Sequence, residues 1–344
     1  MKYYLKNCVW EITLACCFSC KYCGSMAGHV RKNELTLGEC LSVADQLGEL
    51  GCETVSMIGG EVFMRKDWDI IAERLTHKGI QVAIISNGFL FTDELIEKLK
   101  KVRIDSVAIS IDGLESVHDK YRQKGSYNQC INAVEKLIQN DIDTSVISTL
   151  NSENAESLEE MYELLIHYPL RAWQLQGCSP MGNAATHGID YKISGEKVIR
   201  FVLEHLEISP FPIGVADNIG YYGEGEGYIR GNTSGLGMYK GCSAGISSIG
   251  IDSIGNVRGC ESMYDEYFIE GNLREKTLAV IWNNPEGFSY NRKFLITQLT
   301  GHCTQCEYAV FCGGGCRSYN YFVHGNMYEA PFCVRNRRLE NVRK

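Results

Sequence analysis

The chain has 344 residues, 16 of them cysteine, and a formal net charge of −8 at pH 7. With 44% hydrophobic and 22% charged residues, its composition is that of a globular protein, which excludes a disordered or collagen-like chain. The acidic balance argues against a nucleic-acid-binding protein, which would need a basic surface. Cysteine is too sparse for a disulfide scaffold, yet too frequent to be incidental.

The sequence contains neither a predicted transmembrane segment nor a signal peptide. The sequence contains no run of 18 apolar residues, so we expect no transmembrane helix. The segment from Met1 to Lys6 is not a signal peptide, because Glu11 interrupts the apolar run that follows it. We therefore expect a cytoplasmic protein, with no membrane or nucleic-acid partner. Thiols stay reduced in the cytoplasm, so clustered cysteines there are metal ligands or catalysts rather than disulfides.

Strand-like and helix-like segments alternate over the first two hundred residues. The apolar strand-like runs are Val9–Leu14, Thr54–Ile58, Gln81–Ser86, Ser106–Ile111, Thr144–Leu150 and Ala172–Gly177. A helix with a capping box at Thr36 and Glu39 follows the first run, and the later helical segments are Asp67–His77, Asp93–Lys101, Asn128–Asn140 and Ser157–Tyr168. Six such units predict a parallel sheet with fewer strands than a closed eight-stranded barrel, hence a partial (β/α)₆ barrel.

The pattern changes after the sixth unit. Nine glycines between residues 214 and 241 predict a loop or hinge. Beyond it, Ile246–Asp252 and Asn256–Arg258 flank a turn and predict a short hairpin. The rest is rich in cysteine and poor in long periodic segments, which favours a small α+β domain built around metal. We therefore expect a barrel over residues 1–212, a connector over 213–241 and a cysteine-rich domain over 242–344.

The first cysteine cluster follows the first strand directly. Cys16, Cys20 and Cys23 have the spacing C-x3-C-x2-C. Three thiolates on one loop can hold three irons of a [4Fe–4S] cluster and leave the fourth iron open to a chelating molecule. Two alternatives remain at this point: a tetrahedral zinc site, or a C-x2-C-x2-C set that uses Cys17.

This loop resembles that of the radical S-adenosylmethionine (SAM) superfamily. The resemblance implies that SAM chelates the fourth iron, and that reduction cleaves it to methionine and a 5′-deoxyadenosyl radical, which abstracts a substrate hydrogen. The family fold is a partial (β/α)₆ barrel. Gly59, Gly60 and Glu61 end the second strand where the family has its GGE motif. There the glycines would let the backbone approach the ligand, and Glu61 would offer its carboxylate to the SAM ammonium. A simple strand-to-helix turn is the alternative.

The resemblance assigns further SAM contacts near the carboxyl ends of later strands, where barrel enzymes bind ligands. Ser110 would reach the ribose or the carboxylate, Arg122 would pair with the carboxylate, and Gln176 would lie near the adenine. The remaining expected cofactor-binding residues are Tyr22 in the cluster loop and Ser86 at the end of the third strand. For each, a turn residue or a surface side chain is the alternative.

A second set of seven cysteines resembles the SPASM domain of peptide- and protein-modifying radical SAM enzymes. These cysteines are Cys242, Cys260, Cys303, Cys306, Cys312, Cys316 and Cys333. The resemblance implies two auxiliary [4Fe–4S] clusters, so three clusters in all. The inner one would use Cys242, Cys260 and Cys316, and the outer one the other four. A zinc ribbon is the alternative. The inner cluster would lack a fourth ligand, so we expect an open iron that binds a substrate thiolate, or ligation by Cys178.

Two residues are candidates for proton or hydrogen transfer. Glu261 stands where sulfatase-maturing relatives carry an acidic general base, although a surface glutamate is the alternative. Cys178 follows the sixth strand and would donate a hydrogen atom to a substrate radical, unless it is structural or a ligand. Cys40, Cys52 and Cys130 lie in predicted elements and are expected to be small buried hydrophobes.

The leading hypothesis is a radical SAM enzyme that modifies a peptide or protein by thioether or carbon–carbon crosslinking, epimerisation or oxidation, as in formylglycine formation. Only fifteen residues precede Cys16, so we expect no recognition domain before the barrel. Either a separate leader-recognition protein or another surface would then bind the leader, or the substrate is not a leader peptide. A flavodoxin- or ferredoxin-type protein would supply electrons. The alternatives are oxidation or rearrangement of a sugar or tetrapyrrole, and an electron-transfer or iron–sulfur scaffold protein, which the GGE motif disfavours.

Overall fold

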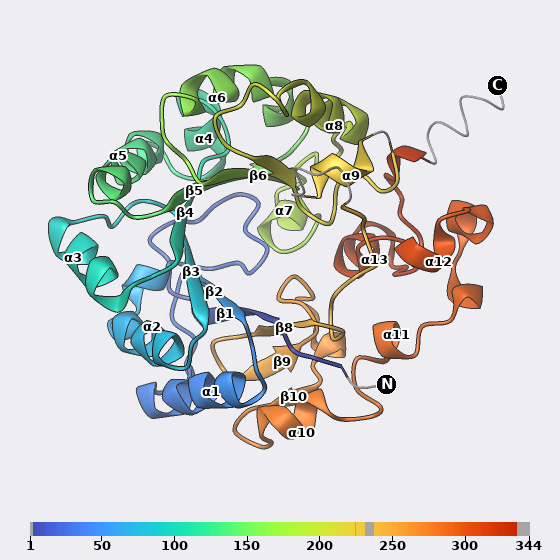
Figure 1. The fold of residues 1–344 in the computed structure, drawn as a ribbon, viewed down its shortest axis with the longest axis horizontal. Helices are drawn as coiled ribbons and strands as arrows, with labels where there is room; N and C mark the ends of the chain where they lie inside the picture. The colour runs from blue at the N-terminus through green and yellow to red at the C-terminus, as the bar shows by residue number, and fades with distance from the viewer. Residues whose placement is uncertain (1–2, 224, 231–236, 336–344) are drawn as a thin grey trace.

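The computed structural model describes residues 3–223, 225–230 and 237–335 (Figure 1). Within these residues the strands form one sheet in the order β10-β9-β8-β1-β2-β3-β4-β5-β6-β7. The strands are β1 (Asn7–Thr13), β2 (Thr54–Gly59), β3 (Gln81–Ser86), β4 (Ser106–Ser110), β5 (Thr144–Leu150), β6 (Ala172–Gly177), β7 (Ile213–Val215), β8 (Ser248–Ile251), β9 (Asn256–Arg258) and β10 (Gly271–Asn272). Neighbours from β1 to β7 run parallel, which confirms the partial barrel.

The helices fall into a long set in the barrel and a short set in the cysteine-rich part. The first set is α1 (Leu37–Glu49), α2 (Trp68–His77), α3 (Asp93–Val102), α4 (Glu115–Tyr121), α5 (Ser126–Gln139), α6 (Leu158–Leu165), α7 (Asn183–Thr186) and α8 (Gly195–Glu204). The second is α9 (Glu226–Ile229), α10 (Leu278–Trp282), α11 (Ser289–Arg292), α12 (Ala309–Cys312) and α13 (Arg317–His324). Figure 1 shows α1, α2, α3, α5, α6 and α8 along the outer side of the curved sheet.

Alternation along the strands places the core between the sheet and these helices. In β1, Cys8, Trp10 and Ile12 are buried in the main apolar cluster. The capping box at α1 is present as predicted, because the Thr36 side chain accepts from the N–H of Glu39 and the Glu39 carboxylate accepts from the N–H of Thr36. The observed strand bounds differ from the expected ones by no more than two residues.

The glycine-rich stretch is not a loop throughout, and the prediction was wrong in two places. Ile213–Val215 forms β7 against β6, with Ile213 and Val215 buried. Glu226–Ile229 forms α9, whose buried Glu226 pairs with Arg230 at 3.0 Å. Tertiary pairing and a buried ion pair outweigh the local glycine content here. Residues 224 and 231–236 of this stretch lie outside the described residues.

The predicted hairpin is present as β8 and β9, which run antiparallel. Strand β8 also pairs in parallel with β1, so that the cysteine-rich part extends the barrel sheet at its first edge. The domain bounds at 212 and 242 therefore stay a prediction, since one sheet crosses both. Among the described residues, no helix is both long and apolar enough to cross a membrane.

Candidate active site

The loop that carries Cys16, Cys20 and Cys23 is anchored by hydrogen bonds at several points. The N–H of Cys16 donates to the carbonyl of Gly28 at 3.1 Å. At the other end, the backbone and side-chain amides of Asn183 in α7 donate to the carbonyls of Cys23 and Cys20, each at 2.9 Å. The loop is therefore held between the end of β1 and the start of α7. Sequence reasoning did not identify Asn183.

The two glycines of the GGE motif allow one backbone to approach another. A Cβ at Gly59 would overlap the carbonyl oxygen of Thr13, and a Cβ at Gly60 would overlap that of Ala15. The N–H of Gly60 donates to Thr13 at 2.9 Å, and that of Glu61 donates to Ala15 at 2.7 Å. In this structure the glycines bring the end of β2 against the start of the cluster loop, whereas the sequence suggested close approach to a ligand.

Glu61 is fully buried, and its carboxylate accepts hydrogen bonds from the protein. Ser86 Oγ donates at 2.9 Å, the N–H of Asn87 at 2.8 Å and that of Phe63 at 3.3 Å. Burial raises the pKa of Glu61 to about 7, while these hydrogen bonds oppose the rise. Ser86 thus contacts Glu61 here. The SAM contacts expected of both residues stay predictions.

A buried carboxylate, Asp112, ties the cluster loop to the fourth strand. It accepts from the Tyr22 hydroxyl and from Arg122 Nε, and its other oxygen accepts from the N–H of Thr149 at 2.7 Å. Burial alone would raise the pKa of Asp112, but the Arg122 guanidinium outweighs it and lowers the pKa. The imidazole of His118 accepts the N–H of Asp112 at 3.3 Å. Tyr22 and Arg122, both predicted to bind SAM, are therefore brought together by one carboxylate.

The other predicted site residues, near the carboxyl ends of β4 and β6, make fewer hydrogen bonds. Ser110 is buried at the end of β4, and Gln176 is half-buried at the end of β6, where its amide donates to Thr149 Oγ1 at 3.0 Å. Cys178 packs with Tyr22 and its neighbours beside the cluster loop, and burial raises the pKa of its thiol to about 12. Cys178 is therefore protonated near neutral pH.

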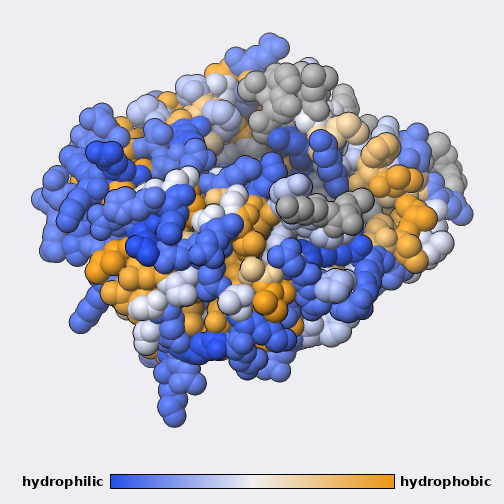
Figure 2. All heavy atoms as spheres, turned by 60° about the horizontal axis from the view of Figure 1, so that its bottom comes forward, coloured by the Kyte–Doolittle hydropathy of each residue, from blue (hydrophilic) through white to orange (hydrophobic). Residues whose placement is uncertain are grey.

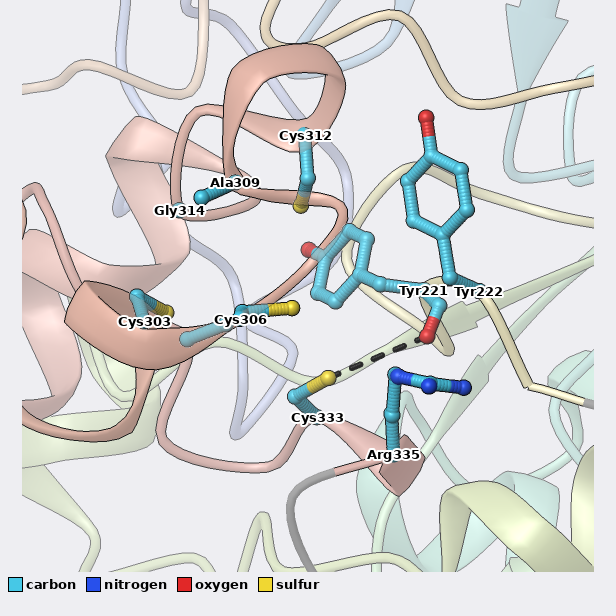
Figure 3. A pocket seen from close by; sticks show the side chains of 10 residues that line it. Tyr221, Tyr222, Cys303, Cys306, Ala309, Cys312, Gly314, Cys333 and Arg335 are labelled. Carbon is cyan, nitrogen blue, oxygen red and sulfur yellow. Dashed lines mark hydrogen bonds between the residues drawn. The ribbon is translucent and has the colours of Figure 1, made fainter. Parts of the chain in front are cut away.

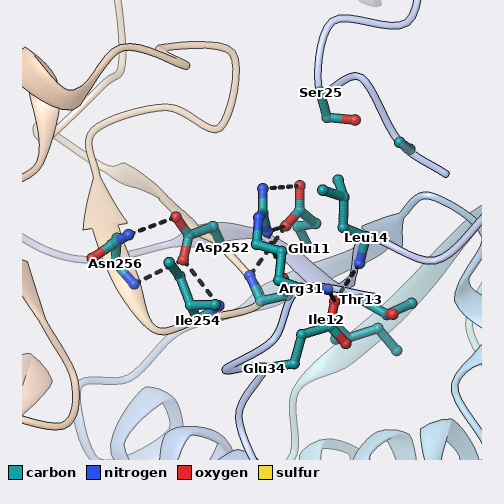
Figure 4. Close-up of polar contacts among 12 residues, drawn as sticks. Glu11, Ile12, Thr13, Leu14, Ser25, Arg31, Glu34, Asp252, Ile254 and Asn256 are labelled. Carbon is teal, nitrogen blue, oxygen red and sulfur yellow. Dashed lines mark hydrogen bonds and ion pairs between the residues drawn. The ribbon is translucent and has the colours of Figure 1, made fainter. Parts of the chain in front are cut away.

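A second buried network joins β1 to Tyr264 in the segment that follows Cys260, and Figure 4 shows the Glu11–Arg31 pair at its centre. Glu11 is fully buried and accepts from Arg31 and from the Tyr264 hydroxyl, as well as from the N–H of Ser253 at 3.1 Å. Arg31 also donates to the Tyr264 oxygen at 2.7 Å. Sequence reasoning missed this network. The available signal was a glutamate within an apolar strand, since a buried charge needs a partner.

Glu261 faces this network. It lies over Gly250, where a Cβ would overlap the Glu261 backbone. Burial raises the pKa of Glu261 to about 8, and the Glu11 carboxylate adds to the rise, while Arg258 and Arg31 oppose it. The position places a half-buried carboxyl group beside Cys260. Its role as a base stays a prediction.

The three cysteines expected at the inner cluster are mutual neighbours. Burial raises the pKa of Cys316, and the thiols of Cys242 and Cys260 raise it further. The Tyr221 hydroxyl accepts the N–H of Cys316 at 3.0 Å, which fixes the start of α13. Asn291 donates to the carbonyl of Cys242 at 3.2 Å. Three thiols held in this way suit thiolate ligation of iron.

The four cysteines expected at the outer cluster line one cavity (Figure 3). These are Cys303, Cys306, Cys312 and Cys333. Tyr221, Tyr222 and Arg335 complete the wall. Among the residues that the structure describes, no three His, Cys, Asp or Glu side chains converge on a single metal ion. Four thiols around one cavity are a donor set that fits a multi-iron cluster. Ligation by these cysteines stays a prediction.

Comparison with known families decides the identity of the chain. Residues 10–165 match the model of the radical SAM superfamily, and residues 242–307 match SPASM, an iron–sulfur cluster-binding domain. The chain belongs to the radical SAM superfamily. As a SPASM member of that superfamily, it uses SAM and [4Fe–4S] clusters as cofactors. Cys312, Cys316 and Cys333 lie beyond the matched residues.

Radical SAM relatives with different names match nearly the whole chain. The AdoMet-dependent heme synthase of Methanosarcina barkeri is 28% identical over 94% of this chain and 95% of its own length. The mycofactocin maturase MftC of Mycolicibacterium smegmatis is also 28% identical, over 91% and 78%. The structure of Streptococcus suis SuiB bound to S-adenosylmethionine has a TM-score of 0.78 at 17% identity, over 96% and 78%. SuiB has also been solved with its precursor peptide SuiA.

Proposed function

We propose that this enzyme reductively cleaves SAM at a cluster on Cys16, Cys20 and Cys23 and abstracts hydrogen from a peptide or protein side chain or α-carbon. The observation that carries the proposal is the anchored three-cysteine loop beside Gly59–Glu61, inside the region that matches the superfamily. When bound, the cluster and SAM supply a 5′-deoxyadenosyl radical.

The chain's own residues bind and orient SAM. Arg122, held by Asp112, binds the SAM carboxylate, and Glu61 accepts from the SAM ammonium. Support comes from the buried Asp112 contact, which fixes the guanidinium and the Tyr22 ring together beside the cluster loop. Ser110 and Gln176 contact the ribose and the adenine from the ends of β4 and β6.

The cysteine-rich part binds two auxiliary clusters, an inner one on Cys242, Cys260 and Cys316 and an outer one on the four cavity cysteines. Glu261 takes the substrate proton after hydrogen abstraction. Its place between the Glu11 network and Cys260 supports this role. Cys178, whose side chain packs with Tyr22, donates a hydrogen atom to the substrate radical, and the fourth position of the inner cluster is left to substrate.

A peptide substrate is supported by the similarity to the mycofactocin maturase, which matches 91% of this chain. The modification would be a thioether or carbon–carbon crosslink, an epimerisation or an oxidation. A flavodoxin- or ferredoxin-type protein in the cytoplasm would reduce the enzyme, and a separate protein would bind the leader.

A tetrapyrrole is the second candidate substrate. It is favoured by the AdoMet-dependent heme synthase, which this chain matches over 95% of that relative's length. In this case the same radical would abstract hydrogen from a tetrapyrrole side chain.

Deuterium transfer separates the two substrates. Anaerobically reduced enzyme with SAM would be incubated either with deuterated peptides or with an iron tetrapyrrole that carries deuterated side chains. Mass spectrometry would then measure deuterium in 5′-deoxyadenosine. Transfer from a peptide supports the first proposal, and transfer from the tetrapyrrole alone replaces it with the second. If iron-loaded, reduced enzyme forms no 5′-deoxyadenosine, both are wrong.

A further inference from the structure

Among the residues that the structure describes, two buried tyrosine hydroxyls near the inner cysteines have no hydrogen-bond acceptor. Tyr239 is 4% exposed and Tyr290 is 7% exposed, and the hydroxyl of each is buried with no described group that accepts its proton. An unsatisfied buried hydroxyl costs about 1–3 kcal/mol, so native proteins rarely leave one without a bound group that accepts from it. Two such groups around one set of thiols call for a common explanation.

Tyr290 is held against the segment that carries Cys260. Its hydroxyl oxygen lies against Gly259, where any Cβ would overlap it. The next residue, Asn291, donates to the carbonyls of Cys242 at 3.2 Å and Ala244 at 2.8 Å, so α11 is fixed to the turn that holds Cys242. Burial raises the pKa of Tyr290, and the thiols of Cys242 and Cys260 are among the groups that raise it further. The Tyr290 hydroxyl therefore lies beside Gly259, the residue before Cys260, on a helix whose next residue binds the Cys242 carbonyl.

Tyr239 borders the same set from another segment. Its ring packs on Tyr221 with 4.9 Å between centroids, and the Tyr221 hydroxyl accepts the N–H of Cys316 at 3.0 Å. Burial raises the pKa of Tyr239, followed by the effects of Tyr221 and of the Cys242 and Cys316 thiols. The two tyrosines thus pack against the segments that carry the three inner cysteines, Tyr290 at Gly259 and the Cys242 turn and Tyr239 through Tyr221 at the start of α13.

The outer cavity differs in this respect. The tyrosines that line it, Tyr221 and Tyr222, already donate their hydroxyls to the backbone carbonyls of Asp217 and Tyr239. The hydroxyls without an acceptor thus lie beside the inner cysteines, whereas the hydroxyls of Tyr221 and Tyr222 already donate to the backbone.

We propose that the Tyr239 and Tyr290 hydroxyls donate hydrogen bonds to sulfur atoms of the inner auxiliary cluster and thereby raise its reduction potential. A hydrogen bond to a cluster sulfur stabilises the more negative, reduced state, and such bonds are a main means by which proteins set cluster potentials. Both are positioning residues for the cluster. The inference rests on the proposed ligation by Cys242, Cys260 and Cys316.

The test is an anaerobic redox titration of the three-cluster enzyme, followed by electron paramagnetic resonance. A Cys242→Ala variant identifies the signal of the inner cluster. In Tyr290→Phe and Tyr239→Phe we expect the inner midpoint to move to more negative potential. At the wild-type midpoint, fewer than half of the inner clusters would then be reduced, while the outer signal would stay unchanged. Tyr168→Phe is the matched control, because its hydroxyl bonds to Glu135 at 3.2 Å in the barrel.

Unchanged inner midpoints in both variants would overturn the inference. If a variant fails to assemble its clusters, the hydrogen bonds are tested in the wild type instead. Electron–nuclear double resonance in H₂O and D₂O would detect exchangeable protons coupled to the inner cluster. An exchangeable proton coupled to the inner cluster supports the hydrogen bonds, and its absence contradicts them. A Cys242→Ala enzyme that keeps every cluster would overturn the ligand assignment and this inference with it. Failure to cleave SAM would overturn only the proposed function, since the potentials do not depend on turnover.

Discussion

The barrel and the cysteine-rich part hold their cysteines in different ways. Around the cluster loop, Glu61, Asp112 and Asn183 have their polar groups paired within the protein. In the described residues, five of the eight buried polar atoms without a partner belong instead to the later part of the chain. They come from Tyr239, Arg258, Tyr290, Arg292 and Asn320. The barrel thus pairs the polar groups around its loop, whereas the later part of the chain leaves several buried polar atoms unpaired among the described residues, two of which are the hydroxyls that we propose meet the inner cluster.

Packing shows the same contrast. The barrel buries an apolar face of each long helix against the sheet. The cysteine-rich part has short helices and places guanidinium groups over aromatic rings, as with Arg292 over Trp282 at 4.5 Å and Arg317 over Tyr328 at 4.7 Å. Its exposed surface includes Val310 and Phe311 of α12, and Figure 2 shows an apolar patch on that side of the molecule. The hairpin and α10 of this part join the main apolar cluster of the barrel, whereas the outer cysteines lie in a small separate cluster with Leu299 and Ala330. We expect that small cluster to depend on metal for its stability.

The largest expected effect, loss of SAM cleavage, distinguishes Cys16 from Cys17 in the cluster loop. Cys16→Ala removes a proposed ligand of the SAM cluster that the alternative C-x2-C-x2-C set would not use, so we expect SAM cleavage to fall to background while the auxiliary clusters remain. Cys17→Ala is the matched control and should keep cleavage, because C-x3-C-x2-C does not use Cys17. The measurement is 5′-deoxyadenosine formed anaerobically per enzyme. Loss of cleavage in Cys17→Ala with retention in Cys16→Ala would replace the ligand set by C-x2-C-x2-C, which uses Cys17 instead of Cys16.

Loss of the outer cluster should increase hydrogen exchange in the cysteine-rich part and leave exchange in the barrel unchanged. Cys333→Ala removes one of four thiols that line the outer cavity. We expect the iron and sulfide content to fall by one cluster, and hydrogen exchange to rise across residues 301–335 but not in β1–β6. Exchange measured by mass spectrometry checks both. Equal loss of protection in the barrel would show that the two parts do not differ in their dependence on metal.

A methyl group at the GGE motif should destabilise the barrel where the end of β2 meets the cluster loop. Gly60→Ala forces a Cβ against the Ala15 carbonyl, and such overpacking costs about 1–3 kcal/mol of unfolding free energy. Gly28→Ala is the control, since its Cβ would meet no atom within 4 Å. Thermal unfolding of the two variants compares them. Equal melting temperatures would mean that the β2 end can move away from the cluster loop.

The smallest effect is a pH dependence in the Asp112 site. Burial lowers the pKa of His118 to about 4 from 6.5, and the Arg122 charge lowers it as well. Between these values the unfolded chain binds a proton that the folded chain does not, so stability falls as pH decreases below 6.5. The loss is about 1.4 kcal/mol per pH unit. His118→Asn should flatten the change in melting temperature between pH 7.5 and 5.5. A wild-type slope retained in this variant would contradict the assignment.

The sequence was sufficient for the barrel strands because each lies in a local pattern. Apolar runs bounded by helical segments predicted six parallel strands, and Thr36 with Glu39 predicted the start of α1. The spacing of the cysteines, through its resemblance to the SPASM domain, also predicted which four of them line the outer cavity. β7 was missed because its pairing with β6 is tertiary, and glycine content dominates the local signal.

The polar contacts around the site could not be read from the sequence, because they join distant residues. Tyr22 meets Asp112 across 90 positions, and Glu11 meets Tyr264 across 253. The unpartnered hydroxyls of Tyr239 and Tyr290 are a property of side-chain direction and burial, which no spacing encodes.

The most direct test of the account counts clusters in the two parts separately. Mössbauer spectroscopy and iron analysis would compare anaerobically prepared wild type with a Cys16, Cys20 and Cys23→Ala triple variant. We predict three [4Fe–4S] clusters in the wild type and the two auxiliary clusters alone in the variant. Zinc in place of iron, or a triple variant with the same number of clusters as the wild type, would contradict it.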